Sequence, residues 1–154
     1  ELDRMVSTVH GLFRVVLLTP KASLLDCRAG SVILPAHDGQ RGILRNHCPM
    51  LAGLSLGILQ VREIIDRPDA FYLLEGGFVR VTENHVTILA YNAVTFEGME
   101  KDQIKNFLSQ AQNTAAGQDF IQTPLGKADA ERSRLLVRMA GLAGIEVEPL
   151  EQPQ

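Results

Sequence analysis

The sequence predicts an all-β sandwich followed by a C-terminal α-helical hairpin, and two observations carry this prediction. Six of the eight aromatic residues lie before residue 97, within short apolar runs that have the period of two expected for β-strands. After residue 97 the apolar residues recur about every 3.6 positions, as on an amphipathic helix. We therefore expect a sandwich over residues 1–96, a two-helix hairpin over residues 97–144 and a disordered tail over residues 145–154.

Short apolar runs separated by turn residues predict the first strands. One run covers Phe13 to Thr19 and ends at Pro20, and a second covers Ser23 to Cys27. A third run, Ser31 to Leu34, follows Ala29-Gly30. Strands that are this short and this evenly spaced are typical of a sandwich.

A β-hairpin is the clearest local prediction. Residues 78–82 alternate between apolar and more polar side chains, and residues 86–90 alternate back after the two-residue turn Glu83-Asn84. Asparagine suits the second turn position because it tolerates positive φ. Gly76-Gly77 interrupts the strand before the hairpin and predicts either a bulge or a sharp bend, at which the sheet folds over on itself.

Two apolar stripes predict the helical hairpin. Gly117 lies where the first helix could stop, and Thr123-Pro124 is typical of an N-cap followed by proline at the first helical position. The first stripe consists of Ile104, Phe107, Leu108, Ala111 and Ala115, and the second of Leu125, Ala128, Leu135, Leu136, Met139 and Leu142.

Composition argues against several functions. A formal net charge of -3 and a pI near 5.8 disfavour a nucleic-acid partner, since phosphate binding relies on clustered Lys and Arg. No apolar run reaches the roughly 20 residues that cross a bilayer, so we expect no direct membrane insertion. The two cysteines, Cys27 and Cys48, are too few for a disulfide framework, and we expect both to be buried as small apolar residues.

The segment Ser31–Leu51 gathers the residue types that an enzyme site would use. A catalytic zinc takes about three protein ligands, yet the available ligands lack H-E-x-x-H or H-x-H spacing. A nucleophile pair of Cys48 and His47 is also disfavoured, because neighbours on an extended chain point to opposite faces. We therefore expect a non-catalytic protein without a metal, in which His37 and His47 make turn hydrogen bonds or lie at an interface and His85 starts a strand, half exposed. The candidate ligands are His10, His37, Asp38, His47, Cys48 and His85.

Four ordered motifs give the chain a family resemblance. They are Pro35 with Asp38–Leu44, Asn46–Leu51, Gly76-Gly77-Phe78 and Asn84–Ala90. Together with the preceding strand and the following helical hairpin, they resemble the epsilon subunit of the bacterial F-type ATP synthase over about residues 13–139. One such motif alone would be a weak signal, whereas four at compatible spacing are specific.

The resemblance implies a non-catalytic rotor subunit that couples c-ring rotation to ATP synthesis. Its sandwich would bind the gamma subunit and the c-ring. The chain would be a peripheral subunit on the cytoplasmic side of the inner or plasma membrane. The residues that match the family's c-ring contact are Asp38, Gly39, Gln40, Arg41 and Gly42, with Gln40 and Arg41 at the tip of the turn. Those that match its gamma contact are His47, Cys48, Pro49 and Ala52.

The resemblance also implies that the helical hairpin can extend along gamma toward the catalytic beta subunits and block ATP hydrolysis. Four basic and two acidic residues give the second helix a local net charge of +2 between residues 127 and 138. Arg132, Arg134 and Arg138 are therefore candidates for meeting an acidic segment of beta. A solvated face stabilised by pairs four residues apart explains the same charges equally well.

Some members of this family bind ATP through the motif Ile/Leu-Asp-x-x-Arg-Ala. The nearest match here, Lys101–Asn106, keeps only Asp102 and replaces the arginine by Lys105, which lacks its planar fork. We therefore expect no ATP and no other cofactor. The alternative to a rotor subunit is a β-sandwich adaptor or binding module with a helical cap, but carbohydrate platforms usually present Trp and this chain has none.

Overall fold

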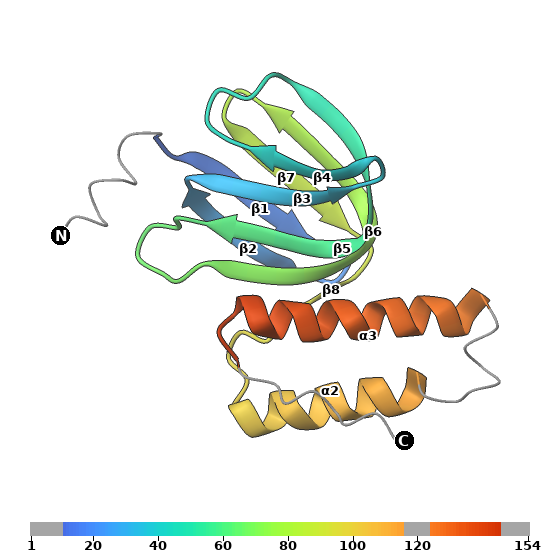
Figure 1. Cartoon of the computed structure of the whole chain (residues 1–154). Helices are drawn as coiled ribbons and strands as arrows, with labels where there is room; N and C mark the ends of the chain where they lie inside the picture. The colour runs from blue at the N-terminus through green and yellow to red at the C-terminus, as the bar shows by residue number, and fades with distance from the viewer. Residues whose placement is uncertain (1–10, 116–123, 146–154) are drawn as a thin grey trace. The chain divides into compact units, whose positions relative to one another are not determined.

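The computed structural model describes residues 11–115 and 124–145, which belong to two compact units divided between Thr95 and Phe96. The first unit consists of strands and the second of helices (Figure 1). Residues outside the described ranges are 146–154 of the predicted tail 145–154, the candidate ligand His10, and the predicted helix-end residues Gly117 and Thr123.

Eight strands make up the described part of the first unit. They are β1 (Phe13–Leu18), β2 (Ser23–Ala29), β3 (Ser31–Ala36), β4 (Gly39–Ile43), β5 (Met50–Arg62), β6 (Ala70–Thr82), β7 (His85–Ala90) and β8 (Ala93–Val94). Apolar residues at every second position are buried, as in β1, where Phe13, Val15 and Leu17 face inward. β2 and β3 each extend two residues beyond their predicted ends, because pairing with β1 and β4 continues to those positions.

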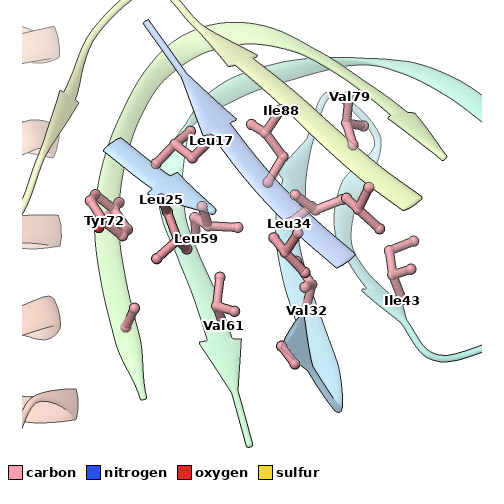
Figure 2. Close-up of a cluster of buried hydrophobic side chains, with 14 of the residues drawn as sticks. Leu17, Leu25, Val32, Leu34, Ile43, Leu59, Val61, Tyr72, Val79 and Ile88 are labelled. Atoms are coloured by element: carbon pink, nitrogen blue, oxygen red, sulfur yellow. The ribbon is translucent and has the colours of Figure 1, made fainter. Parts of the chain in front are cut away.

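The strands form one sheet in the order β2-β1-β7-β6-β5-β3-β4, and β8 pairs with β6. β1 and β7 are parallel, whereas β6 pairs antiparallel with both β5 and β7. Leu17 and Leu25, near one end of this order, belong to the same buried cluster as Leu34 and Ile43, near the other end (Figure 2). The sheet is therefore folded over its own core, and the predicted sandwich followed by a helical hairpin is confirmed.

The glycine pair of β6 is a bend and not a bulge. Gly76 and Gly77 have φ values of 84° and 139°, which L side chains rarely adopt. On one edge of β6, the register with β5 continues unchanged from Gly77 opposite Leu54 to Glu75 opposite Leu56. On the other edge, pairing with β7 at Gly77 continues in the same register into pairing with β8 at Leu74. No extra residue is inserted, so the two glycines turn the strand by their dihedral angles alone.

The predicted hairpin between β6 and β7 is confirmed. Thr82 pairs with His85, and the two residues between them, Glu83 and Asn84, have φ values of 46° and 60°. Two successive positive φ angles are typical of a type I′ turn, whose twist matches that of the flanking strands. Asn84 has the positive φ expected from its residue type, and Glu83 adopts a positive φ as well.

The second unit contains α2 (Lys101–Ala115) and α3 (Pro124–Leu142), which run antiparallel beside each other (Figure 1). Ile104 and Leu108 of α2 and Leu136 and Met139 of α3 are almost fully buried. The hydroxyl of Ser133 in α3 donates a hydrogen bond of 3.0 Å to the carbonyl of residue 111 in α2. The hydroxyl of Ser133 therefore gives the two helices a polar link.

The predicted apolar stripe of α3 is wrong at two positions. Ala128 is exposed and Leu142 is 36% exposed, whereas Ser133 and Ala140 are buried. Small residues allow α2 to approach closely, and the hydrogen bond of Ser133 satisfies its hydroxyl there. The side chains of Ala115, Leu125 and Lys127 lie outside the described residues. α3 ends in a Schellman motif, in which Gly144 has a φ of 76° and the amide of residue 145 donates to the carbonyl of residue 140 at 2.9 Å.

Candidate partner-binding surface

The predicted c-ring segment lies in the hairpin between β3 and β4. His37 and Asp38 form its turn, and residue 36 pairs with Gly39 directly after it. Gln40 and Arg41, which the sequence analysis placed at the tip, lie in β4 instead, opposite residues 35 and 34. Strand pairing that continues to the last residue before the turn leaves only His37 and Asp38 at the tip. Residues 39–42 are all exposed on this edge strand.

Arg41 is held by contacts within the hairpin. Its guanidinium forms an ion pair with Asp38, in which Nε lies 3.3 Å from Oδ1, and its Nη1 lies 3.5 Å from the sulfur of Met50. The hydrogen bond from Arg41 lowers the pKa of the Asp38 carboxyl, and the same bond raises the pKa of Arg41. Both side chains remain about half exposed, so the pair contributes little to stability but fixes where the positive charge lies.

The predicted gamma segment His47, Cys48 and Pro49 lies in the loop between β4 and β5. Nδ1 of His47 is 2.7 Å from the carbonyl oxygen of Cys48, and the backbone N–H of His47 donates to the carbonyl of Leu44. The Cys48 thiol is exposed and lies 3.9 Å from the same Nδ1. The expectations that Cys48 is buried and that the two side chains point apart are therefore wrong, because this loop does not have the alternation of a strand.

This arrangement does not make a nucleophile pair. To bond a carbonyl oxygen, Nδ1 of His47 must carry its proton, and in that state it cannot accept one from the thiol of Cys48. The other cysteine, Cys27, is half-buried, and burial raises the pKa of its thiol. A thiol with a raised pKa is less nucleophilic at neutral pH.

A reciprocal pair of asparagines ties this loop to the β6–β7 turn. The backbone N–H of Asn46 donates to Oδ1 of Asn84 at 2.6 Å, and Nδ2 of Asn84 donates to Oδ1 of Asn46 at 3.2 Å. Asn46 has a φ of 64°, so both residues occupy left-handed conformations that asparagine tolerates. The carbonyl of Asn84 also accepts the N–H of Arg14 at the start of β1. One turn residue thus holds two other segments.

Ala52, the last predicted gamma residue, has its side chain against the core. It pairs with Val79, which is fully buried, and it packs on the core cluster. Side chains alternate along a strand, so the neighbouring Leu51 faces outward and is 75% exposed. The outward-facing side chain in this part of β5 is therefore that of Leu51.

Leu51 belongs to a set of exposed apolar residues that the sequence analysis missed. Phe78 pairs with Leu89 across β6 and β7, and these two side chains are 50% and 52% exposed. Tyr91, 66% exposed, meets Phe78 edge to face at a centroid distance of 6.5 Å. We call Leu51, Phe78, Leu89 and Tyr91 the outer apolar patch. The sequence shows that apolar residues alternate with others along each of these strands. Only the pairing of β5, β6 and β7 shows that the four side chains share one face.

The tip of the β3–β4 hairpin lies on the same face as this patch. A Cβ atom at Gly53, the residue that pairs with Phe78, would lie 2.5 Å from Cδ2 of His37. The imidazole of His37 therefore covers Gly53, and its backbone N–H donates to the Gly53 carbonyl at 3.3 Å. The hairpin tip and β5 are held together at this point by the backbone of His37 and by its imidazole.

Charged residues lie on the same sheet beyond the patch. Arg14 of β1 forms two hydrogen bonds with Asp26 of β2, at 3.1 and 2.8 Å. The hydrogen bond from Arg14 is the main cause that lowers the pKa of Asp26, and the charge of His85 also contributes. Arg80 lies opposite Leu51 and is exposed. The face therefore combines apolar side chains with the ion pair of Arg14 and Asp26 and with the exposed Arg80.

The three arginines of α3 do not share one environment. Arg134 and Arg138 are exposed and are four residues apart, so they lie on the same helical face. Arg132 is half-buried and lines a cleft of about 220 Å³ between α2 and α3, together with Asp129 and Ser133. Arg134 and Arg138 are the two of the three that are accessible to a partner.

The described residues hold no chemistry that would support a metal site. No three of their His, Cys, Asp and Glu side chains gather within reach of a single ion. Within those same ranges, neither helix combines the length and hydrophobicity that a membrane crossing requires. What the surface does offer is an apolar patch, a tied loop and an exposed edge strand, which are features of a protein–protein interface.

Comparison with known proteins finds relatives of this chain among ATP synthase subunits. Residues 12–96 match the family model of the ATP synthase delta/epsilon chain, beta-sandwich domain. An ATP synthase epsilon chain of Thermosynechococcus vestitus is 34% identical over 141 residues, which cover 89% of this chain and 96% of that one. An epsilon chain from a Synechococcus species is 36% identical over the same coverage. The chloroplastic epsilon chain of Chlamydomonas reinhardtii is 33% identical over 64% of this chain and 72% of its own length.

Among solved structures, one chain of the Euglena gracilis mitochondrial ATP synthase has a TM-score of 0.55 with this chain. The two share 18% sequence identity, and the alignment covers 88% of this chain and 82% of that one. At this level of identity the likeness concerns the fold.

Proposed function

Because the chain belongs to the delta/epsilon subunit family of ATP synthase, we propose that it is the non-catalytic epsilon subunit of the central stalk, coupling c-ring rotation to ATP synthesis. The observation that carries this proposal is the 34% identity with an epsilon chain across 89% of the sequence, which includes both units. The four motifs of the β-sandwich are consistent with it, since they map to turns and paired strands of the first unit. Its place would be peripheral, on the cytoplasmic side of the membrane.

We assign the gamma contact to the loop His47–Pro49 and the outer apolar patch. An exposed cluster of two aromatic and two leucine side chains is the type of surface that a partner covers. The exposed Arg80, opposite Leu51, favours an acidic side chain beside the apolar area of gamma. Ala52 supports this contact through β5, whose Leu51 faces outward.

We assign the c-ring contact to the β3–β4 hairpin, residues 38–42. The edge strand is exposed, and its two glycines, Gly39 and Gly42, have no atoms within 4 Å of an added Cβ. A flat polar edge of this kind can accept a polar loop from a neighbouring subunit. The ion pair of Arg41 with Asp38 would fix the charge that such a loop meets.

A charge-swap experiment separates this contact from the internal ion pair. Arg41→Glu should weaken proton-coupled ATP synthesis and leave the sandwich folded, because the pair is exposed. The double variant Asp38→Arg/Arg41→Glu restores an internal pair with the charges exchanged. If the c-ring contacts the charge at residue 41, ATP synthesis stays weak in the double variant. Recovery in the double variant, or normal coupling in Arg41→Glu, would exclude Arg41 as a ring contact.

We extend the proposal to the helical unit, residues 97–144, as an arm that inhibits ATP hydrolysis when it extends toward a beta subunit. Such an arm needs packing that can be undone, and the buried apolar side chains described in the two helices are limited to Ile104, Leu108, Leu136, Met139 and Ala140. Arg134 and Arg138 are its exposed candidates for an acidic segment of beta, and Arg132 could join them if the helices separate. ATPase activity of the complex with and without residues 97–154 tests this arm: a rise on deletion supports it, and no change contradicts it.

Co-purification tests the assignment as a whole. The tagged chain, expressed with gamma and washed at mild salt, should retain gamma in a 1:1 complex. Phe78→Ser removes an exposed ring of the patch, which leaves the buried core untouched, and should reduce the recovery of gamma. Failure of the wild-type chain to retain gamma would contradict the proposed function. Full recovery of gamma with the variant would exclude the outer apolar patch as the gamma contact.

A further inference from the structure

We propose that Asn84 is a positioning residue for gamma binding, which acts by holding the loop His47–Pro49 through Asn46. The inference rests on the proposed function, because it concerns the loop assigned there to gamma. Asn84 itself lies in the β6–β7 turn and is half-buried. Its sequence distance of 38 residues from Asn46 gives no hint of this connection.

The loop has few other backbone restraints. Between Ile43, the last residue of β4, and Met50, the first residue of β5, the chain follows no regular structure. The N–H of His47 bonds the carbonyl of Leu44 at 3.2 Å, which closes a local turn but ties the loop to nothing outside itself. The connection to another part of the sheet comes from Asn84, which bonds the residue directly before His47.

The geometry of this connection fixes a position and an orientation. Oδ1 of Asn84 accepts the N–H of Asn46 at 2.6 Å, and Nδ2 of Asn84 donates to Oδ1 of Asn46 at 3.2 Å. Two bonds from one planar carboxamide restrain rotation as well as distance. Because Asn46 is held with a φ of 64°, the direction in which the chain leaves toward His47 is also set.

The turn itself is rigidly placed, so it can serve as an anchor. Asn84 follows the pair of Thr82 with His85, and its carbonyl accepts the N–H of Arg14 at 3.0 Å. Three strands, β1, β6 and β7, therefore meet at this turn. A loop pre-ordered before binding loses less conformational freedom when a partner arrives, which increases affinity.

The test uses two glycine variants of the full chain. Asn84→Gly removes the carboxamide and keeps a turn of positive φ, since glycine adopts φ near 60° without strain. Glu83→Gly is the matched control, because residue 83 has a φ of 46° in the same turn and its side chain is exposed. Both variants should give circular dichroism spectra like that of the wild type.

Two measurements on these variants decide the question. In the free chain, amide hydrogen exchange at Asn46 should become about tenfold faster in Asn84→Gly and stay unchanged in Glu83→Gly, since only the first loses the acceptor. In titrations with purified gamma, Asn84→Gly should bind about tenfold more weakly than Glu83→Gly, as expected for two lost hydrogen bonds. Asn84→Asp keeps an acceptor for Asn46 and should give an intermediate affinity.

The outcomes separate this inference from the proposed function. If the wild-type chain does not bind gamma, the proposed function fails and this inference fails with it. If the wild type binds gamma and the two glycine variants bind equally well, the proposed function stands and the positioning role of Asn84 is refuted. Faster exchange at Asn46 in both glycine variants would also refute it, because the cause would then be the turn and not the carboxamide.

Discussion

Gly77 should be the glycine at which a single methyl group is most costly. Its φ of 139° lies in a region that L residues rarely adopt. An added Cβ would lie 2.0 Å from the carbonyl oxygen of Leu89 and 2.9 Å from Cα of Ala90. Both atoms belong to the backbone of β7, which pairs with β6 directly at this point. A side-chain rotation therefore cannot relieve the clash, and the two strands must move apart.

Two contributions set the size of the effect in Gly77→Ala. Backbone strain in such a region costs about 1–3 kcal/mol. Separating β7 from β6 by the ångström or so that the methyl needs weakens neighbouring ladder hydrogen bonds, each with a net contribution of about 1 kcal/mol. We therefore expect the free energy of unfolding of the sandwich to fall by about 3–5 kcal/mol.

Urea denaturation followed by tyrosine fluorescence measures this change in the sandwich alone. The chain has no Trp, and its two tyrosines, Tyr72 and Tyr91, both lie in the first unit. With an m-value of about 2 kcal/mol/M, the midpoint of Gly77→Ala should fall by about 2 M. Gly42→Ala is the control, since its added Cβ would meet nothing within 4 Å, and its midpoint should stay or rise slightly. A shift below about 0.5 M in Gly77→Ala would refute the account of the bend.

Three further predictions follow from side-chain contacts. Asp26→Asn should lower the melting temperature at neutral pH and have little effect near pH ~2. The reason is that Arg14 lowers the pKa of Asp26 in the folded state. The stabilisation from this pair is therefore present above the pKa of Asp26 in the unfolded chain, and it is lost as the pH falls through the folded-state pKa. Equal effects at both pH values would contradict this. Ser133→Ala should destabilise the helical hairpin by about 1 kcal/mol relative to Ser109→Ala, measured by loss of helical circular dichroism, because only Ser133 bonds the other helix. Arg134→Glu should raise ATP hydrolysis by the assembled complex toward the level reached by deleting the arm, and an unchanged rate would remove this residue from the inhibitory contact.

Local patterns were sufficient to predict the fold. The alternation on both sides of Glu83-Asn84 specifies a hairpin because the side chains of a strand repeat every two residues. The change of period after residue 97 likewise specifies helices. The rotation of the α3 stripe could not be predicted, because burial of Ser133 depends on a carbonyl that α2 provides.

The surface was less predictable because it depends on register. Motif matching identified the segments around Arg41 and His47, but it placed Arg41 at the hairpin tip and selected Ala52 instead of the outward-facing Leu51. The outer apolar patch joins side chains from β5, β6 and β7, which only the pairing of those strands brings together. The tie between Asn46 and Asn84 was invisible for the same reason.

Titration of gamma into the full chain by calorimetry measures whether the chain binds gamma through the outer apolar patch. We expect a 1:1 complex with a negative heat-capacity change, because the outer apolar patch becomes buried, and a less negative heat-capacity change for Phe78→Ser. Absence of binding by the wild-type chain, or a complex whose heat-capacity change is the same in the variant, would contradict this expectation.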